Sequence, residues 1–188
     1  MKLRTLLMGA IASTALAPAA MAERGSDGEV KIIYWQAPSI LNPYLSSGTK
    51  DIESASLVIE PLGRYDQNGD LVPYLAEEIP TIENGGVSSD LTTITWKIKP
   101  GLLWSDGSPV TSADVKFTAD YCMNPEGGCS QLAKFEGVSS VDVVDDLTVK
   151  VTFSEPKPNP YGPFMGGQSP IIQAAQFADC TGAKAPEC

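Results

Sequence analysis

Two short segments of alternating apolar and polar residues constrain the fold of this chain more than any other feature. In the first, Ile94, Trp96 and Ile98 alternate with threonine and lysine. In the second, residues 147–153, the sequence LTVKVTF places an apolar residue at every other position. Because successive side chains of a strand point to opposite faces, this alternation predicts half-buried strands. The run VSSVDVV just upstream is expected to pair with the second segment, as a hairpin over residues 138–153.

One helix is predicted between these strands, from Thr111 to near Asn124. Thr111 as the N-cap and Asp114 three residues later resemble a capping box, which satisfies free N–H groups and suits the helix dipole. The Asp-Gly pair at 106–107 is typical of a tight turn. Two carboxylates beside Trp104 are also compatible with a metal or acid–base site, but the turn and cap roles account for both.

Weaker patterns complete the secondary structure. Residues 30–35 (VKIIYW) are expected to form a buried first strand, and residues 49–63 a helix that stops at Pro and Gly. An Asn-Gly pair at 68–69 predicts a hairpin turn. Residues 154–170 are rich in Pro and Gly and are expected to be a crossing segment or linker, with a last helix at 172–177.

The first 22 residues carry an export signal. Lys2 and Arg4 precede an apolar run at 6–16 that ends in Ala-Met-Ala at 20–22, which is typical of a cleaved secretory signal peptide. The run is too short to span a bilayer. No cysteine stands at the cleavage point, so we expect a mature chain that begins near Glu23 in the periplasm of a Gram-negative cell, without a lipid anchor.

Charge and composition exclude several functions. The chain has a formal net charge of −10, which argues against nucleic acid and anionic membranes as partners. It has no histidine, so Ser-His-Asp, Cys-His and His-ligated zinc sites are excluded. Any enzymatic interpretation would rest on carboxylates, lysine or tyrosine.

The four cysteines form two close-set pairs, Cys122 with Cys129 and Cys180 with Cys188. In an oxidising compartment an even count suggests disulfides, although four cysteines allow three pairings. Local pairing is the simplest, and it would tie down two short loops. A metal–thiolate site is the alternative, but the spacings are not C-x-x-C.

Longer motifs resemble a known family. The run TWKIKPGLLWSDGSPVTSADVKFTADY, preceded by LNPYLS and EPLGRYDQNGDLVPYLAEE, is similar to the extracellular solute-binding proteins, family 5, the dipeptide/oligopeptide-binding components of ABC importers. The resemblance covers residues 30 to about 170. It implies a mixed α/β, two-lobed clamshell like other periplasmic binding proteins, with an extra β-rich subdomain in the first lobe.

The resemblance also implies a division of the chain. Residues 1–22 would be the signal peptide, 23–60 the start of lobe I, 61–160 the extra mixed α/β subdomain, and 161–188 a truncated return to lobe I. Family members are normally much longer than this chain. We therefore expect an N-terminal fragment in which lobe II is absent.

The implied function is capture without chemistry. A monomer would bind a peptide or related small solute, with no cofactor and no metal site, and deliver it to an ABC-transporter permease; nickel complexes, sugars and opines stay open as ligands. Ligand crevices of such folds lie at the carboxyl ends of strands, so the candidate contacts are Tyr34, Trp35, Pro38, Asn42 and Trp104. Alternatives are a secreted carboxylate-dependent hydrolase or lyase, or a structural module held by two disulfides.

Overall fold

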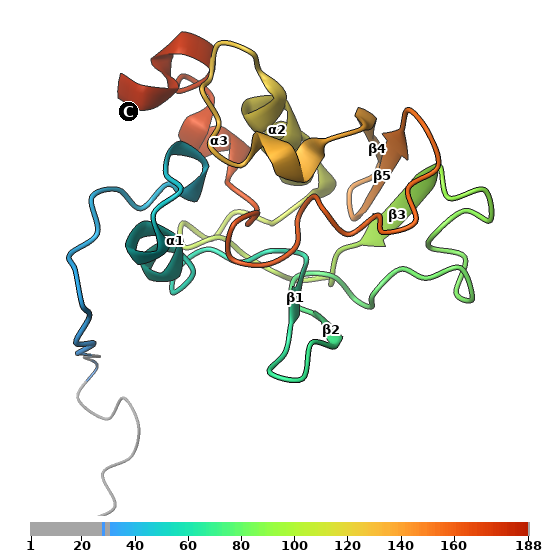
Figure 1. Ribbon diagram of the computed structural model, residues 1–188, viewed down its shortest axis with the longest axis horizontal. Coiled ribbons are helices and arrows are strands. Elements are labelled where there is room, and N and C mark those ends of the chain that lie inside the picture. Colours follow the sequence, from blue (N-terminus) through green and yellow to red (C-terminus); the bar gives the residue numbers. More distant parts are fainter. Residues whose placement is uncertain (1–27, 29–30, 188) are drawn as a thin grey trace, which may run out of the picture. The chain divides into compact units, whose positions relative to one another are not determined.

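A three-stranded antiparallel sheet organises the computed structural model, which describes residue 28 and residues 31–187 (Figure 1). The strands, in the spatial order β3-β5-β4, are β3 (Thr93–Lys97), β4 (Val138–Asp145) and β5 (Thr148–Phe153). The chain divides into two compact units after Ile33, and every helix and strand described below lies in the second.

The register of the sheet confirms the predicted alternation. Ile94 lies opposite Val151 and Trp96 opposite Val149, and all four side chains are fully buried. The predicted hairpin over residues 138–153 is present as β4 and β5. One face of the sheet is therefore committed to the hydrophobic core.

Helix α2 (Ser112–Met123) covers this sheet by packing against β4 and β5. It begins after Thr111 and ends before Asn124, as the sequence predicts. Val115 and Ala119, one helical turn apart, are both fully buried, which places the apolar stripe of the helix in the core.

A second, smaller hairpin consists of β1 (Gly63–Tyr65) and β2 (Leu71–Pro73). Its turn contains the predicted Asn-Gly pair, and Gly69 has a φ of +88°, a conformation that glycine adopts without steric cost. The Asp66 carboxylate accepts a hydrogen bond from the Asn68 N–H at 2.8 Å. The hairpin prediction is confirmed.

Residues 154–170 contain no helix or strand, as predicted, but they belong to the core. Phe164 and Met165 are buried. The Leu62 N–H donates to the Phe164 carbonyl at 2.9 Å, and Met165 forms a parallel bridge with Gly63. The segment is therefore a packed crossing beside β1 and not a loose linker.

The prediction of a buried first strand at 30–35 is wrong for the residues described. Val30 lies outside the described residues, and residues 31–35 form no strand. Ile32, Ile33 and Trp35 are exposed. A β-branched run becomes a strand only by pairing with another segment, and no described segment pairs with this one.

Short helical segments make up the remainder. They are η1 (Pro43–Leu45), α1 (Thr49–Ala55), η2 (Leu132–Phe135), α3 (Ala174–Phe177) and η3 (Gly182–Glu187). The predicted helix at 49–63 is present but ends eight residues early, and that at 172–177 begins two residues late. In the described part of the chain, no helix has the length and apolarity needed to cross a membrane.

Cys122 and Cys129 form a disulfide, with their Cα atoms 5.1 Å apart. This confirms the local pairing predicted for the first pair. The second predicted pair includes Cys188, which lies outside the described residues. Cys122 is in the last turn of α2, so the bridge ties the end of this helix to the loop that follows it.

Candidate ligand cleft

A cleft of about 560 Å³ opens where loops of the second unit meet α3, a volume within the range of small-ligand sites. Most of its walls are aliphatic or aromatic. The lining residues are Ile40, Leu41, Asn42, Leu45, Val58, Ile59, Glu60, Leu75, Leu103, Trp104, Ser105, Val110, Ile172, Gln173, Gln176, Phe177 and Ala185.

Two of the five predicted contact residues meet in this cleft. Asn42 and Trp104 line it, although 62 positions separate them in the sequence. Tyr34, Trp35 and Pro38 are not among its lining residues. Trp35 is 70% exposed, and its ring lies against that of Tyr34, with centroids 6.0 Å apart.

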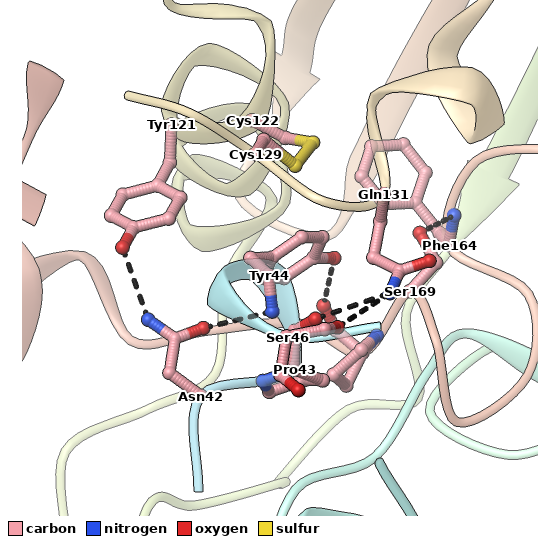
Figure 2. The surroundings of a disulfide bond; sticks show 11 residues. Asn42, Pro43, Tyr44, Ser46, Tyr121, Cys122, Cys129, Gln131, Phe164 and Ser169 are labelled. Carbon is pink, nitrogen blue, oxygen red and sulfur yellow. Dashed lines mark hydrogen bonds between the residues drawn. A yellow bond between two sulfur atoms is a disulfide. The ribbon is translucent and has the colours of Figure 1, made fainter. Parts of the chain in front are cut away.

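The Asn42 side chain is fixed by hydrogen bonds at both ends (Figure 2). Its Nδ2 donates to the Tyr121 hydroxyl at 3.0 Å, and its Oδ1 accepts from the Tyr44 N–H at 3.0 Å as the N-cap of η1. Burial raises the pKa of Tyr121, and its hydroxyl oxygen is the acceptor for the amide. Asn42 is thereby pre-organised at the cleft wall.

Trp104 is oriented by a buried carboxylate. Its indole Nε1 donates to Asp114 Oδ2 at 3.3 Å, and Asp114 is only 6% exposed. The same oxygen accepts the Thr111 N–H at 2.9 Å, while Oδ1 accepts the Ala174 N–H at 2.9 Å. Asp114 therefore caps α2 and also joins Trp104 to the start of α3.

Gln173, which no sequence motif indicated, is buried in the same wall. Its Nε2 donates to Asp106 Oδ2 at 2.8 Å and to Ser108 Oγ at 2.9 Å. The hydroxyl and N–H of Ser108, together with Gln173, lower the pKa of Asp106 to about 2. The predicted Asp-Gly turn is present, with Gly107 at a φ of +86°, and it anchors a cleft residue 67 positions away.

Charge in the cleft comes from one group. Among the described lining residues, Glu60 carries the one ionisable side chain, and its carbonyl accepts the Ile171 N–H at 2.9 Å. Leu41, Val58 and Leu103 are largely exposed there. An apolar surface with amides and one carboxylate can hold an amphipathic solute by non-covalent contacts.

The two carboxylates of the Trp104 loop are occupied structurally. Asp106 accepts from Ser108 and Gln173, and Asp114 from the backbone of two helix starts. A paired-carboxylate hydrolase needs one free acid and one free base or nucleophile facing the substrate. Hydrogen bonding to these oxygens favours a scaffolding role for both groups.

A mixed α/β unit with a pre-organised, mostly apolar cleft is suited to binding a small solute. Residues 70–186 match the model of the bacterial extracellular solute-binding proteins, family 5 (its middle region), and the chain belongs to this family. Membership confirms the resemblance on which the fold prediction depends.

Individual relatives agree with this assignment. The chain is 31% identical over 116 residues to the glutathione-binding protein GsiB of Pectobacterium atrosepticum. The matched segment is 62% of this chain and 21% of the relative. It is 35% identical over 101 residues to a Brucella ovis protein named as an ABC transporter peptide-binding protein. This match covers 53% of this chain and 18% of the relative.

A solved structure gives the same fold. The binding protein AgaA in complex with agropinic acid, from A. tumefacien R10, superposes with a TM-score of 0.66 at 28% identity, over 76% of this chain and 28% of that one. The chain thus spans about a fifth of the length of the curated relatives it matches.

Proposed function

We propose that this chain is the substrate-capturing part of an ABC importer, which binds a peptide or related small solute and passes it unchanged to a membrane permease. The observation that carries the proposal is the cleft, in which Asn42, Trp104 and Gln173 converge from three separate segments, each held by its own hydrogen bonds. Pre-organised walls bind a solute with little ordering cost.

The same proposal includes a division of the chain. Residues 23–60 begin the first lobe, 61–160 form the extra subdomain, and 161–188 return to the first lobe. The packed crossing at 154–170 supports this map, since it leads from β5 back to the edge of β1. Amide hydrogen exchange tests the division: protection that changes together within residues 61–160, and separately from the flanking residues, supports it, and one uniform level of protection across both boundaries contradicts it.

Charge favours one class of solute. The cleft offers a carboxylate at Glu60 and, among its described residues, no lysine or arginine, while the whole chain is acidic. Such a site attracts a cationic group over an anionic one. A short peptide with a free terminal ammonium group fits this chemistry, its apolar side chains facing Leu41, Val58 and Leu103.

The export signal and the family support a periplasmic location. We propose that the protein acts in the periplasm, as a monomer, after cleavage next to Ala22. Residues 1–22 lie outside the described residues, so the support for cleavage is the sequence pattern. N-terminal sequencing of protein from a periplasmic extract tests it, and a start other than Glu23, or a membrane-bound pool, would argue against it.

The ligand experiment uses the longest natural product that contains this chain. Thermal shifts are measured with a peptide library, the same peptides N-acetylated, an opine, a sugar and a nickel chelate. Stabilisation by free peptides above all others supports the proposal. Stabilisation by another solute alone would replace the peptide by that solute, and turnover of any of them would point to an enzyme.

A further inference from the structure

The turn that carries Asn42 is held from one side by the end of α2. Tyr121 directly precedes Cys122, and its hydroxyl accepts the hydrogen bond from Asn42 Nδ2. The Tyr121 ring packs edge-on against Tyr44, with centroids 6.1 Å apart, and against Phe177 of the cleft wall at 6.2 Å. The end of α2 thus contacts the turn that carries Asn42 through one hydrogen bond and one aromatic pair, and it contacts α3 through a second aromatic pair.

The other side of the turn is held by the two residues that follow Cys129. The Ser130 N–H donates to the Tyr44 carbonyl at 2.8 Å. Gln131 is 6% exposed, and its Nε2 donates to the carbonyls of Pro43 at 3.3 Å and Ser46 at 2.9 Å (Figure 2). Since buried carbonyls need partners, one amide side chain satisfies two of the acceptors that shape η1.

The disulfide joins the two sides. It joins Cys122 in α2 to Cys129, seven positions later and two residues before Gln131. The loop that it closes contains Gly127 and Gly128, the latter with a φ of +61°. Glycines leave a loop many conformations, whereas a short covalent closure removes most of them. The bond is at the core, since Cys122 is 1% exposed.

From these contacts we infer that the Cys122–Cys129 disulfide and Gln131 act as one positioning unit for the ligand cleft. The disulfide sets where the loop after α2 lies, Gln131 transmits that position to η1, and η1 orients Asn42. Neither the disulfide nor Gln131 lines the cleft, so both act through another residue. The inference rests on the ligand role proposed above.

Two variants of the longest natural product test this unit: Cys122→Ala with Cys129→Ala, and Gln131→Met, which keeps the side-chain length and removes the amide. Amide hydrogen exchange of Tyr44 and Leu45 is measured without ligand. The dissociation constant for a peptide with a free N-terminus is measured well below every unfolding midpoint. The matched control is Val151→Ala, which removes core contacts in β5 away from the cleft.

In both variants the two amides should exchange at least about tenfold faster and the peptide should bind at least about tenfold more weakly, as expected when one or two buried hydrogen bonds are lost. A variant that combines all three substitutions should lose no more protection or affinity than the more affected of the two, because the groups act in series. Val151→Ala should lower the midpoint and leave both readouts unchanged.

Unchanged exchange and affinity in both variants would overturn the positioning role. Equal losses of protection and affinity in Val151→Ala would also overturn it, because the effect would then be one of general stability. If the wild type binds no peptide, the proposed ligand is wrong. Hydrogen exchange still decides the inference in that case: faster exchange at Tyr44 and Leu45 supports it, and unchanged exchange refutes it.

Discussion

The indole Nε1 of Trp104 donates to the Oδ2 of Asp114 at 3.3 Å, which couples a helix cap to the wall of the cleft. A carboxylate at this position satisfies the Thr111 N–H and the Ala174 N–H as well. The same residue therefore contributes to stability and to the orientation of an aromatic side chain that lines the cleft.

Replacing this carboxylate tests its structural role. Asp114→Asn keeps the shape of the side chain but loses the charge at the helix N-terminus and one acceptor oxygen. We expect a lower free energy of unfolding by about 0.5–2 kcal/mol, measured by urea denaturation. The control is Asp120→Asn in the exposed part of the same helix, which should change little; unchanged stability of Asp114→Asn with lost ligand binding would reassign the residue to the ligand.

Acid should weaken the fold through the turn carboxylates. Hydrogen bonds from Ser108 and Gln173 lower the pKa of Asp106 to about 2 from its ordinary 3.8. A group whose pKa is lower in the folded state stabilises the fold above its ordinary pKa, and this contribution is lost as the pH falls towards the folded value.

The free energy of unfolding should therefore decrease between about pH 4 and pH 2. Asp106→Asn should show a smaller decrease over this range, because it removes one of the titrating groups. Asp51 contributes in the same direction, since bonds from Ser46 and the Ser39 N–H lower its pKa. Identical pH profiles for the wild type and Asp106→Asn would contradict the role given to Asp106.

The core of the sheet should be sensitive to lost volume. Ile94 is fully buried opposite Val151, so Ile94→Ala should destabilise the fold by about 2–5 kcal/mol. Val144 is in the same sheet but 58% exposed, and Val144→Ala should cost much less. Equal effects in chemical denaturation would mean that β3 does not pack as described.

Trp104 should report ligand binding. Of the three tryptophans, Trp35 and Trp96 do not line the cleft, so a ligand-induced change in intrinsic fluorescence should disappear in Trp104→Phe. Phenylalanine keeps a ring in the wall, so binding should weaken less than in Trp104→Ala. A fluorescence change that persists in Trp104→Phe would place the ligand elsewhere.

The elements whose determinants are local could be predicted from the sequence. Alternation at Ile94–Ile98, the Thr111–Asp114 cap and the Asn68-Gly69 turn each depend on neighbours within a few positions, and each is present. The prediction of a strand at 30–35 was wrong because a strand needs a pairing partner, which an alternating or β-branched pattern does not itself supply.

The cleft was only partly predictable for the same reason. Asn42 and Trp104 stand in motifs with recognisable turn chemistry. Gln173, by contrast, reaches the wall because Asp106 and Ser108 bind its amide across 67 and 65 positions. Nothing in the local pattern around Gln173 encodes such a long-range contact.

Isothermal titration of the longest natural product that contains this chain, with a short peptide and its N-acetylated form, tests the central claim most directly. Saturable one-to-one binding of the free peptide is expected, with the peptide recovered chemically unchanged and with weaker binding after N-acetylation or in Glu60→Gln. No heat with either peptide while another solute binds, or recovery of a cleaved peptide, would contradict the account.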